Sequence, residues 1–216
     1  MLAAVLKQKY QVYKTPGNLN NFIGTSLTLL GLQKSIDLAI IEIGTNHPGE
    51  IGALARIVDP THAAITNIGS GHIGFFGSRE AIFEEKTALF DEMRENGHIF
   101  INNDDPYLCK YQNSKRIIHT FGLKVESEFQ GDYEGLNEQG CARLSIKNGQ
   151  KIQLTIPGKH QVSNALLAGS VGLELGISYQ QIKKGLESTG KTDKRMEMIR
   201  IGGATIINDA YNANPE

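Results

Sequence analysis

The sequence alternates between short apolar runs and segments with helical spacing, and this alternation constrains the fold more than any other feature. Residues 38–43 and 63–68 are nearly continuous apolar runs, which are typical of parallel strands buried on both faces. Helical spacing is seen over residues 50–58, and again over residues 79–94 after the N-cap Ser78. We therefore predict an α/β fold with a mostly parallel, doubly wound sheet flanked by helices.

The pattern changes near residue 123. Residues 127–133, 142–147 and 151–156 alternate between apolar and polar side chains, and Asn148-Gly149 between the last two is a strong hairpin signal. We predict a small antiparallel sheet appended to the parallel one. Helices over 162–175 and 179–186 and a hairpin about Gly202-Gly203 follow it.

Composition excludes several classes of partner. The 216 residues include 22 basic and 23 acidic ones, and this balance does not indicate a nucleic-acid or membrane surface. No apolar run approaches the roughly 20 residues of a membrane span. Cys109 and Cys141 lie far apart and form no CxxC pair, which favours a reduced, cytoplasmic protein. We predict no nucleic-acid partner and no membrane span.

Two residues lie where α/β enzymes carry their chemistry, which is beyond the carboxyl ends of strands, and a lysine follows on the next helix. Glu42 interrupts an apolar run, and because a buried carboxylate needs a cation, we favour a metal there over a pairing with a base. His72 follows the run that includes Ile65, and it fits a ligand or a structural hydrogen bond equally well. Lys86 on the next helix fits, by itself, a solvated surface lysine.

Each of several other polar residues fits two interpretations. Asp104 and Asp105 fit a Mg²⁺ site or an ordinary helix cap. His160 and Asn164 fit a cap or a site for a nucleotide base, and Arg195 fits a phosphate clamp or a surface ion pair. No GxxxxGK[ST] or GxGxxG segment is present. The residues alone indicate an α/β enzyme-like domain with a candidate metal site.

Eight segments, taken in chain order, resemble the Mur ligase family. They are TPGNLNN (15–21), IIEIGTN (40–46), ITNIGSGHIGFFGS (65–78), EK (85–86), NNDD (102–105), GKHQVSNA (158–165), KRME (194–197) and NDAYNANP (208–215). The last segment is the most specific, and it is most similar to members that add D-alanyl-D-alanine to UDP-N-acetylmuramoyl-tripeptide (UDP-MurNAc-tripeptide). The resemblance implies that ATP phosphorylates the substrate carboxylate and that an amine attacks the acyl phosphate.

The resemblance also implies residue roles. Glu42 and His72 would ligate Mg²⁺, and Lys86, carbamylated by CO₂, would hold a second Mg²⁺ or orient the site. The expected cofactors are ATP and Mg²⁺. Contacts to ATP would come from Asn164 and His160 at the adenine, Asp209 at the ribose and Arg195 at the γ-phosphate. The UDP-sugar substrate would face Thr15, Asn18, Asn20 and Asn21.

One departure from the family is expected to matter. The resemblance places a phosphate-binding glycine loop just before the helix that opens this chain, and no such loop is in the sequence. We therefore predict that residues 1–208 are a central ATP-binding domain truncated at its N-terminus, that residues 209–216 are a hinge, and that the chain alone is inactive. Two alternatives remain: another Mur or folylpolyglutamate-type ligase, and a non-catalytic α/β interaction domain.

Overall fold

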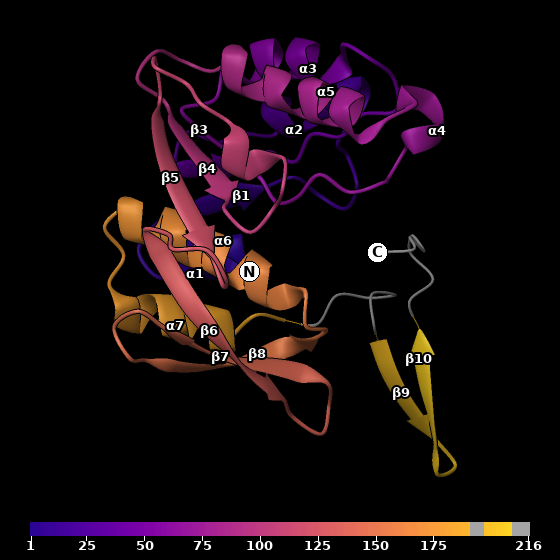
Figure 1. Ribbon diagram of the computed structural model, residues 1–216, viewed down its shortest axis with the longest axis vertical. Helices are drawn as coiled ribbons and strands as arrows, with labels where there is room; N and C mark the ends of the chain where they lie inside the picture. The colour runs from indigo at the N-terminus through magenta and orange to yellow at the C-terminus, as the bar shows by residue number, and fades with distance from the viewer. Residues whose placement is uncertain (191–196, 209–216) are drawn as a thin grey trace. The chain divides into compact units, whose positions relative to one another are not determined.

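The computed structural model describes residues 1–190 and 197–208, which fall into two units. The first, here called the parallel unit, is Lys9–Phe121. The second, the antiparallel unit, combines Met1–Gln8 with the chain from Gly122 onward. Figure 1 labels the elements of both, and each unit is described by itself.

The strands of the parallel unit pair in parallel, as the apolar runs predict. Strand β1 (Val12–Lys14) pairs in parallel with β2 (Leu38–Ile40). Strands β3 (His62–Ile65), β4 (His98–Asn102) and β5 (Ile117–Gly122) follow one another in parallel register. The prediction of a mostly parallel α/β fold with an appended antiparallel sheet is confirmed.

Helices connect these strands and begin at residues that the sequence predicts. Helix α2 (Phe22–Leu30) is capped by the Asn21 side chain, and α5 (Arg79–Asp91) is capped by Ser78. Helix α3 (Glu50–Val58) packs beside α5, as Figure 1 shows. A short helix α4 (Ile73–Phe76) precedes α5, and a single 3₁₀ turn, η1 (Leu108–Lys110), follows β4.

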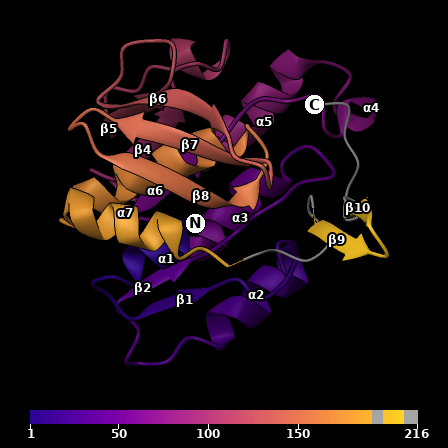
Figure 2. The ribbon, with the colours of Figure 1, turned by 90° about the horizontal axis from the view of Figure 1, so that it is seen from below.

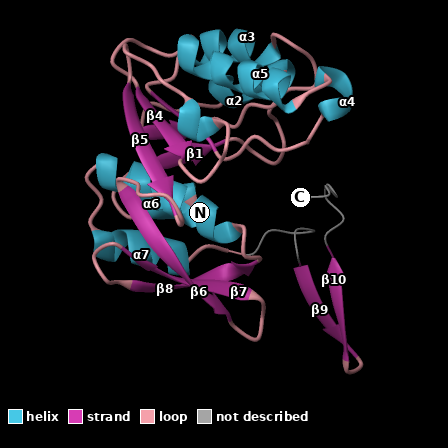
Figure 3. Cartoon of the chain, viewed as in Figure 1, coloured by secondary structure: helices cyan, strands magenta, loops and turns pink. Residues whose placement is uncertain are grey.

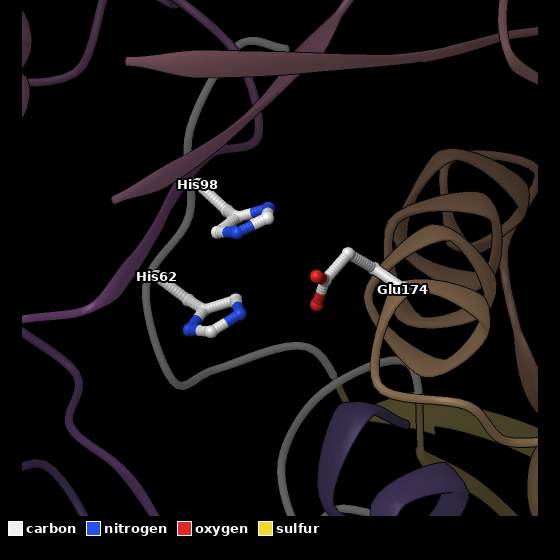
Figure 4. A group of neighbouring side chains, drawn as sticks. All are labelled: His62, His98 and Glu174. Carbon is white, nitrogen blue, oxygen red and sulfur yellow. The ribbon is translucent and has the colours of Figure 1, made fainter. Parts of the chain in front are cut away.

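One face of strands β3 and β4 forms the apolar core of the parallel unit. Alternate residues of these strands point to opposite faces. Ala63, Ile65, Ile99 and Ile101 are buried in one cluster with Phe90 of α5. The other face carries His62 and His98, which are paired in register. Their rings are stacked, with centroids 4.9 Å apart, and Figure 4 shows both side chains.

The antiparallel unit holds the sheet that the alternating segments predict. Strands β6 (Phe129–Leu136), β7 (Cys141–Ile146) and β8 (Lys151–Pro157) pair in antiparallel order. Helices α1 (Leu2–Leu6), α6 (Gln161–Glu174) and α7 (Tyr179–Glu187) pack together, and α6 and α7 also contact the sheet (Figures 2 and 3). Gly185 permits the contact between helices, because a Cβ there would lie 2.6 Å from Val5 Cα.

The hairpin predicted near the end of the chain is also present. Strands β9 (Glu197–Ile201) and β10 (Ala204–Asn208) pair in antiparallel order, and both Gly202 and Gly203 have positive φ angles in the turn between them. Over the described residues, no helix combines the length and the apolar character that crossing a membrane requires.

Candidate functional site

The loop after β1 is tied to β2 by Thr15. The Thr15 backbone N–H donates to the Ile40 carbonyl oxygen at 2.9 Å and extends the parallel ladder by one step. Pro16 has no N–H to continue the ladder. The Thr15 hydroxyl instead accepts the backbone N–H of Glu42 at 2.8 Å. The side chain of a residue expected to face substrate therefore fixes the segment that carries Glu42.

Glu42 lies two residues beyond β2, and its surroundings correct the expectation of a buried carboxylate inside a strand. Strand β2 ends at Ile40, and the Glu42 side chain is exposed. The Asn20 Nδ2 donates to Glu42 Oε1 at 3.1 Å. The strand is short because Pro16 ends the pairing, so the carboxylate projects at the carboxyl end of β2, where ligands bind in α/β sheets.

His72 and the asparagine-rich loop share one hollow of about 210 Å³ within the parallel unit. His72 is exposed and adopts a left-handed backbone conformation, with φ 63°, at the N-cap position of α4. The hollow is lined by Asn20, Asn21, Phe22, Gly44, Thr45, Asn46, Glu50, Leu54 and His72. Two of the predicted substrate residues and one predicted metal ligand therefore border the same space.

The Lys86 side chain projects from α5, and its amine reaches the segment that follows a second strand, β3. Its Nζ donates to the Asn67 carbonyl oxygen at 2.9 Å, and Asn67 follows β3 by two residues. The Lys86 side chain is half-buried, in contrast to the solvated lysine that the sequence indicates on its own. Glu42 and Lys86 thus occupy the carboxyl ends of β2 and β3.

Glu85 is a residue whose role sequence reasoning missed. Its carboxylate is buried and accepts the backbone N–H of Gly49 at 2.6 Å and that of Ile51 at 2.9 Å. The Thr45 hydroxyl lies 3.3 Å from the same carboxylate. These bonds join α5 to the N-terminus of α3. The signal in the sequence was the position of Glu85 three residues after the buried Ile82, on the inner face of α5.

Glu50 stabilises the loop that leads into α3. Its Oε2 accepts the backbone N–H of Asn46 at 2.7 Å and that of His47 at 3.1 Å. These donors, and the Thr45 hydroxyl, hold the pKa of Glu50 below its usual value because they stabilise the charged form. The ionised carboxylate of Glu50 therefore holds the loop that forms part of the wall of the hollow.

Two interpretations were open for Asp105, a Mg²⁺ site and a cap, and its contacts are those of a cap. Its Oδ1 accepts the backbone N–H of Tyr107 and of Leu108, and its Oδ2 accepts that of Ile68 at 2.8 Å. The side chain is buried. It acts as the cap of the turn before η1 and fixes the segment that follows β3.

The predicted adenine contacts lie in the antiparallel unit. His160 is exposed at the N-cap position of α6, and its Nε2 lies 2.9 Å from Gln161 Nε2. The Asn164 Nδ2 donates to Gln161 Oε1 at 3.1 Å. The structure therefore brings His160 and Asn164 together through Gln161. Arg195 and Asp209, predicted to contact ATP, lie outside the described residues.

The paired histidines on the other sheet face were not singled out from the sequence. The His62 Nδ1 lies 2.9 Å from the Thr61 hydroxyl, and the His98 Nδ1 lies 2.9 Å from His119 Nε2. Glu174, also labelled in Figure 4, belongs to α6 of the other unit. The rings of His62 and His98, and those of His98 and His119, are stacked on one another, so these histidines form a row of aromatic contacts on this face of the sheet.

Comparison with known proteins gives the same family as the sequence resemblance. Residues 1–172 match the family described as "Mur ligase middle domain". The UDP-N-acetylmuramoyl-tripeptide--D-alanyl-D-alanine ligase of Bacillus subtilis is 37% identical over 217 residues, which cover 100% of this chain and 47% of that protein. The Escherichia coli protein of the same name is 31% identical over 99% of this chain and 49% of its own. The chain spans about half the length of the curated relatives it matches.

Solved structures agree with this result. MurF from Acinetobacter baumannii superposes with a TM-score of 0.91 at 32% identity, covering 99% of this chain and 48% of that one. The MurF ligase from Thermotoga maritima in complex with ADP gives 0.85 at 29% identity, with coverages of 99% and 50%. A folylpolyglutamate synthase from Thermotoga maritima gives 0.69 at 16% identity, covers 96% and 58%, and shares the fold alone. The chain therefore belongs to the Mur ligase middle-domain family.

Proposed function

We propose that this chain is the central, ATP-binding part of a ligase that joins D-alanyl-D-alanine to UDP-MurNAc-tripeptide, with ATP, during peptidoglycan precursor synthesis. Similarity over the whole chain to ligases of that name supports the proposal, as does the likeness to a MurF ligase in complex with ADP. The structural observation that carries it is the placement of Glu42 and of the Lys86 amine beyond the ends of β2 and β3.

Glu42 and His72 are the proposed Mg²⁺ ligands, and they fit the ion unequally. A carboxylate oxygen is a preferred ligand of Mg²⁺, whereas imidazole is a less usual one. The exposed Glu42 side chain has one oxygen bonded to Asn20, and His72 borders the hollow that Asn20 lines. Bound Mg²⁺ supplies charge neutralisation at the transferred phosphoryl group.

Lys86 fits a metal site only in a modified form, because an ammonium group repels a cation. Carbamylation at Nζ replaces the positive charge with a negative one and retains one N–H. That N–H can still donate to the Asn67 carbonyl oxygen, which the amine contacts at 2.9 Å. The proposed role of the carbamylated Lys86 is to hold a second Mg²⁺ or to orient the first.

ATP and the UDP-sugar substrate are assigned to different segments. His160 and Asn164 are the proposed adenine contacts, and Asp209 and Arg195 those of the ribose and γ-phosphate. The loop of residues 15–21 is the proposed substrate side. Asn18 and Asn21 are exposed there, and the side chains of Thr15, Asn20 and Asn21 bond within the chain.

The domain assignment and location complete the proposal. Residues 1–208 are the ATP-binding domain, and residues 209–216 are the hinge toward the part that takes D-alanyl-D-alanine. Within the described residues neither Cys109 nor Cys141 is part of a disulfide, which agrees with a reducing, cytoplasmic location. In this role the protein contributes to the cell wall, and through it to cell shape and division.

A chimera tests the proposed function. Residues 1–216 replace the matched 217-residue stretch of the Bacillus subtilis relative, and the purified chimera receives ATP, Mg²⁺ and UDP-MurNAc-tripeptide. We expect release of phosphate and formation of the amide product with D-alanyl-D-alanine. The natural Bacillus subtilis protein is the control. A folded chimera that is inactive beside an active control would contradict the proposal.

A further inference from the structure

We propose that Asn20 is a positioning residue for Glu42 and not a contact of the UDP-sugar substrate. The inference deepens the proposed function and rests on the role of Glu42 as a metal ligand. Its first support is direct: the Asn20 Nδ2 donates to Glu42 Oε1 at 3.1 Å across 22 residues of sequence. The amide N–H of Asn20 is thereby directed at Glu42, within the chain.

The Asn20 contact is one of three that hold the segment after β2. The Thr15 hydroxyl accepts the Glu42 N–H at 2.8 Å, and the Asn20 carbonyl oxygen accepts the Gly44 N–H at 2.9 Å. The loop therefore fixes the backbone on both sides of Glu42 and one oxygen of its side chain. An exposed glutamate without such contacts would sample several rotamers.

Gly44 gives independent support, because its lack of a side chain makes room for the Asn20 amide. A Cβ placed on Gly44 would lie 3.1 Å from Asn20 Nδ2 and 3.3 Å from the Asn20 side-chain carbonyl carbon. These distances are tighter than ordinary van der Waals contacts. The amide of Asn20 is thus placed against Gly44, and the glycine leaves space for it because it has no side chain.

The chemistry of the amide suits this purpose. An amide N–H donates to one carboxylate oxygen without adding a positive charge, whereas Lys or Arg at this position would repel a divalent cation. The second carboxylate oxygen then serves the metal. Partners of this kind, which orient a metal ligand without touching the metal, typically change metal affinity by 10–100-fold when they are removed.

The three asparagines of the loop differ in their contacts. The Asn21 side chain accepts the backbone N–H of Gly24 at 2.9 Å and caps α2. Asn20 holds Glu42. Asn18 is exposed. Asn18 is therefore the matched control for Asn20, since both are asparagines of one loop.

The first experiment measures metal binding and needs no turnover. Mn²⁺, a substitute for Mg²⁺ at oxygen ligands, is titrated into the 216-residue chain and free Mn²⁺ is followed by electron paramagnetic resonance. We expect Glu42→Gln to remove the tightest site, and Asn20→Ala and Gly44→Ala each to weaken it about tenfold. Asn18→Ala should bind as the parent does, and circular dichroism checks that each variant is folded.

The second experiment separates positioning from substrate binding, in the chimera described above. A positioning role predicts that Asn20→Ala lowers kcat and raises the Mg²⁺ concentration needed for half-maximal rate, with KM for UDP-MurNAc-tripeptide unchanged. A substrate contact predicts a higher KM with kcat unchanged, and that result would overturn the inference.

The outcomes distinguish the inference from the function on which it rests. If the chimera has no ligase activity, the proposed function fails, and the Mn²⁺ titration still decides whether Asn20 positions Glu42. If Glu42→Gln weakens Mn²⁺ binding but Asn20→Ala and Gly44→Ala do not, positioning by Asn20 is refuted. If Glu42→Gln leaves Mn²⁺ binding unchanged, Glu42 is not a metal ligand and the inference fails with it.

Discussion

The loop that holds Glu42 and the junction of α3 and α5 that holds Glu85 each fix a carboxylate, but by different means. Glu85 is buried and accepts two backbone N–H groups, with the Thr45 hydroxyl nearby. Glu42 is exposed, and its carboxylate is held by one side-chain amide. A carboxylate satisfied by buried donors contributes to the fold, whereas one that is oriented but exposed can bind a ligand. The predictions below test this division.

The largest expected effect is on the helix that carries Glu85. Phe90 of α5 is fully buried in the core cluster of the parallel unit. Phe90→Ala should lower the free energy of unfolding by about 3–5 kcal/mol, because the cavity adds to the lost burial. Urea unfolding of the 216-residue chain measures it. Phe75→Ala on α4 is the matched control, since Phe75 is 63% exposed. If Phe90→Ala and Phe75→Ala lower the free energy of unfolding equally, the region of α5 that carries Glu85 does not owe its stability to the buried core.

Glu85→Gln should have the next largest effect. The substitution keeps the size of the side chain but leaves one acceptor oxygen for two backbone N–H groups, so one buried donor loses its partner. We expect a loss of about 1–3 kcal/mol in the free energy of unfolding. Faster amide hydrogen exchange at Gly49 and Ile51 should accompany it.

The adjacent Glu84 supplies the control for that prediction, because its side chain is exposed. Glu84→Gln should leave both the free energy of unfolding and the exchange at Gly49 and Ile51 as they are in the parent. If Glu85→Gln is as mild as Glu84→Gln, the junction of α3 and α5 does not depend on the buried carboxylate.

A smaller effect is expected at Glu50, and it depends on pH. Because donors from the loop hold the pKa of Glu50 below 4.5, the unfolded chain binds more protons than the folded one as the pH falls. The stabilisation is full above the unfolded pKa and is lost as the pH falls through the lowered folded pKa. The Tm difference between the parent and Glu50→Gln should therefore be positive near about pH 7 and should shrink as the pH falls through the lowered folded pKa. A difference that persists in acid would exclude this linkage.

The smallest effect on stability is expected at Glu42. Its side chain is exposed and its loss leaves no buried donor without a partner, because Asn20 can bond to water instead. Glu42→Gln should change the free energy of unfolding by less than about 0.5 kcal/mol. Thermal unfolding of the 216-residue chain checks this, and a loss comparable to that of Glu85→Gln would remove the contrast between the two carboxylates.

Much of the fold follows from local signals in the sequence. Helix α3 spans the predicted residues, because Glu50 begins the apolar spacing and Asp59, with φ 49°, ends it before Pro60. Helix α2 also has local signals at both ends, with Asn21 as its N-cap and Gly31 as its C-cap. Asp105, which fits a helix cap in the sequence, precedes only the 3₁₀ turn η1, and its Oδ1 accepts the backbone N–H groups of Tyr107 and Leu108.

The site was less predictable, because its contacts join distant segments. The bond between Asn20 and Glu42 depends on the register of β1 against β2 and on Pro16, which together end β2 at Ile40. No local pattern gives that register. Residue types at strand ends pointed to Glu42 and His72, and the family resemblance pointed to Lys86. Neither signal revealed that Glu85, next to Lys86, fixes the neighbouring loop.

Turnover of the chimera, measured together with its stability, tests the central claim most directly. We predict that Glu42→Gln lowers kcat more than about 100-fold while its Tm stays within about 2 °C of the parent chimera. Glu85→Gln should lower the Tm, and the fraction that remains folded should keep a kcat within about tenfold of the parent. The claim would be contradicted by a Glu42→Gln chimera with the parent's kcat, or by one that loses activity only because it unfolds.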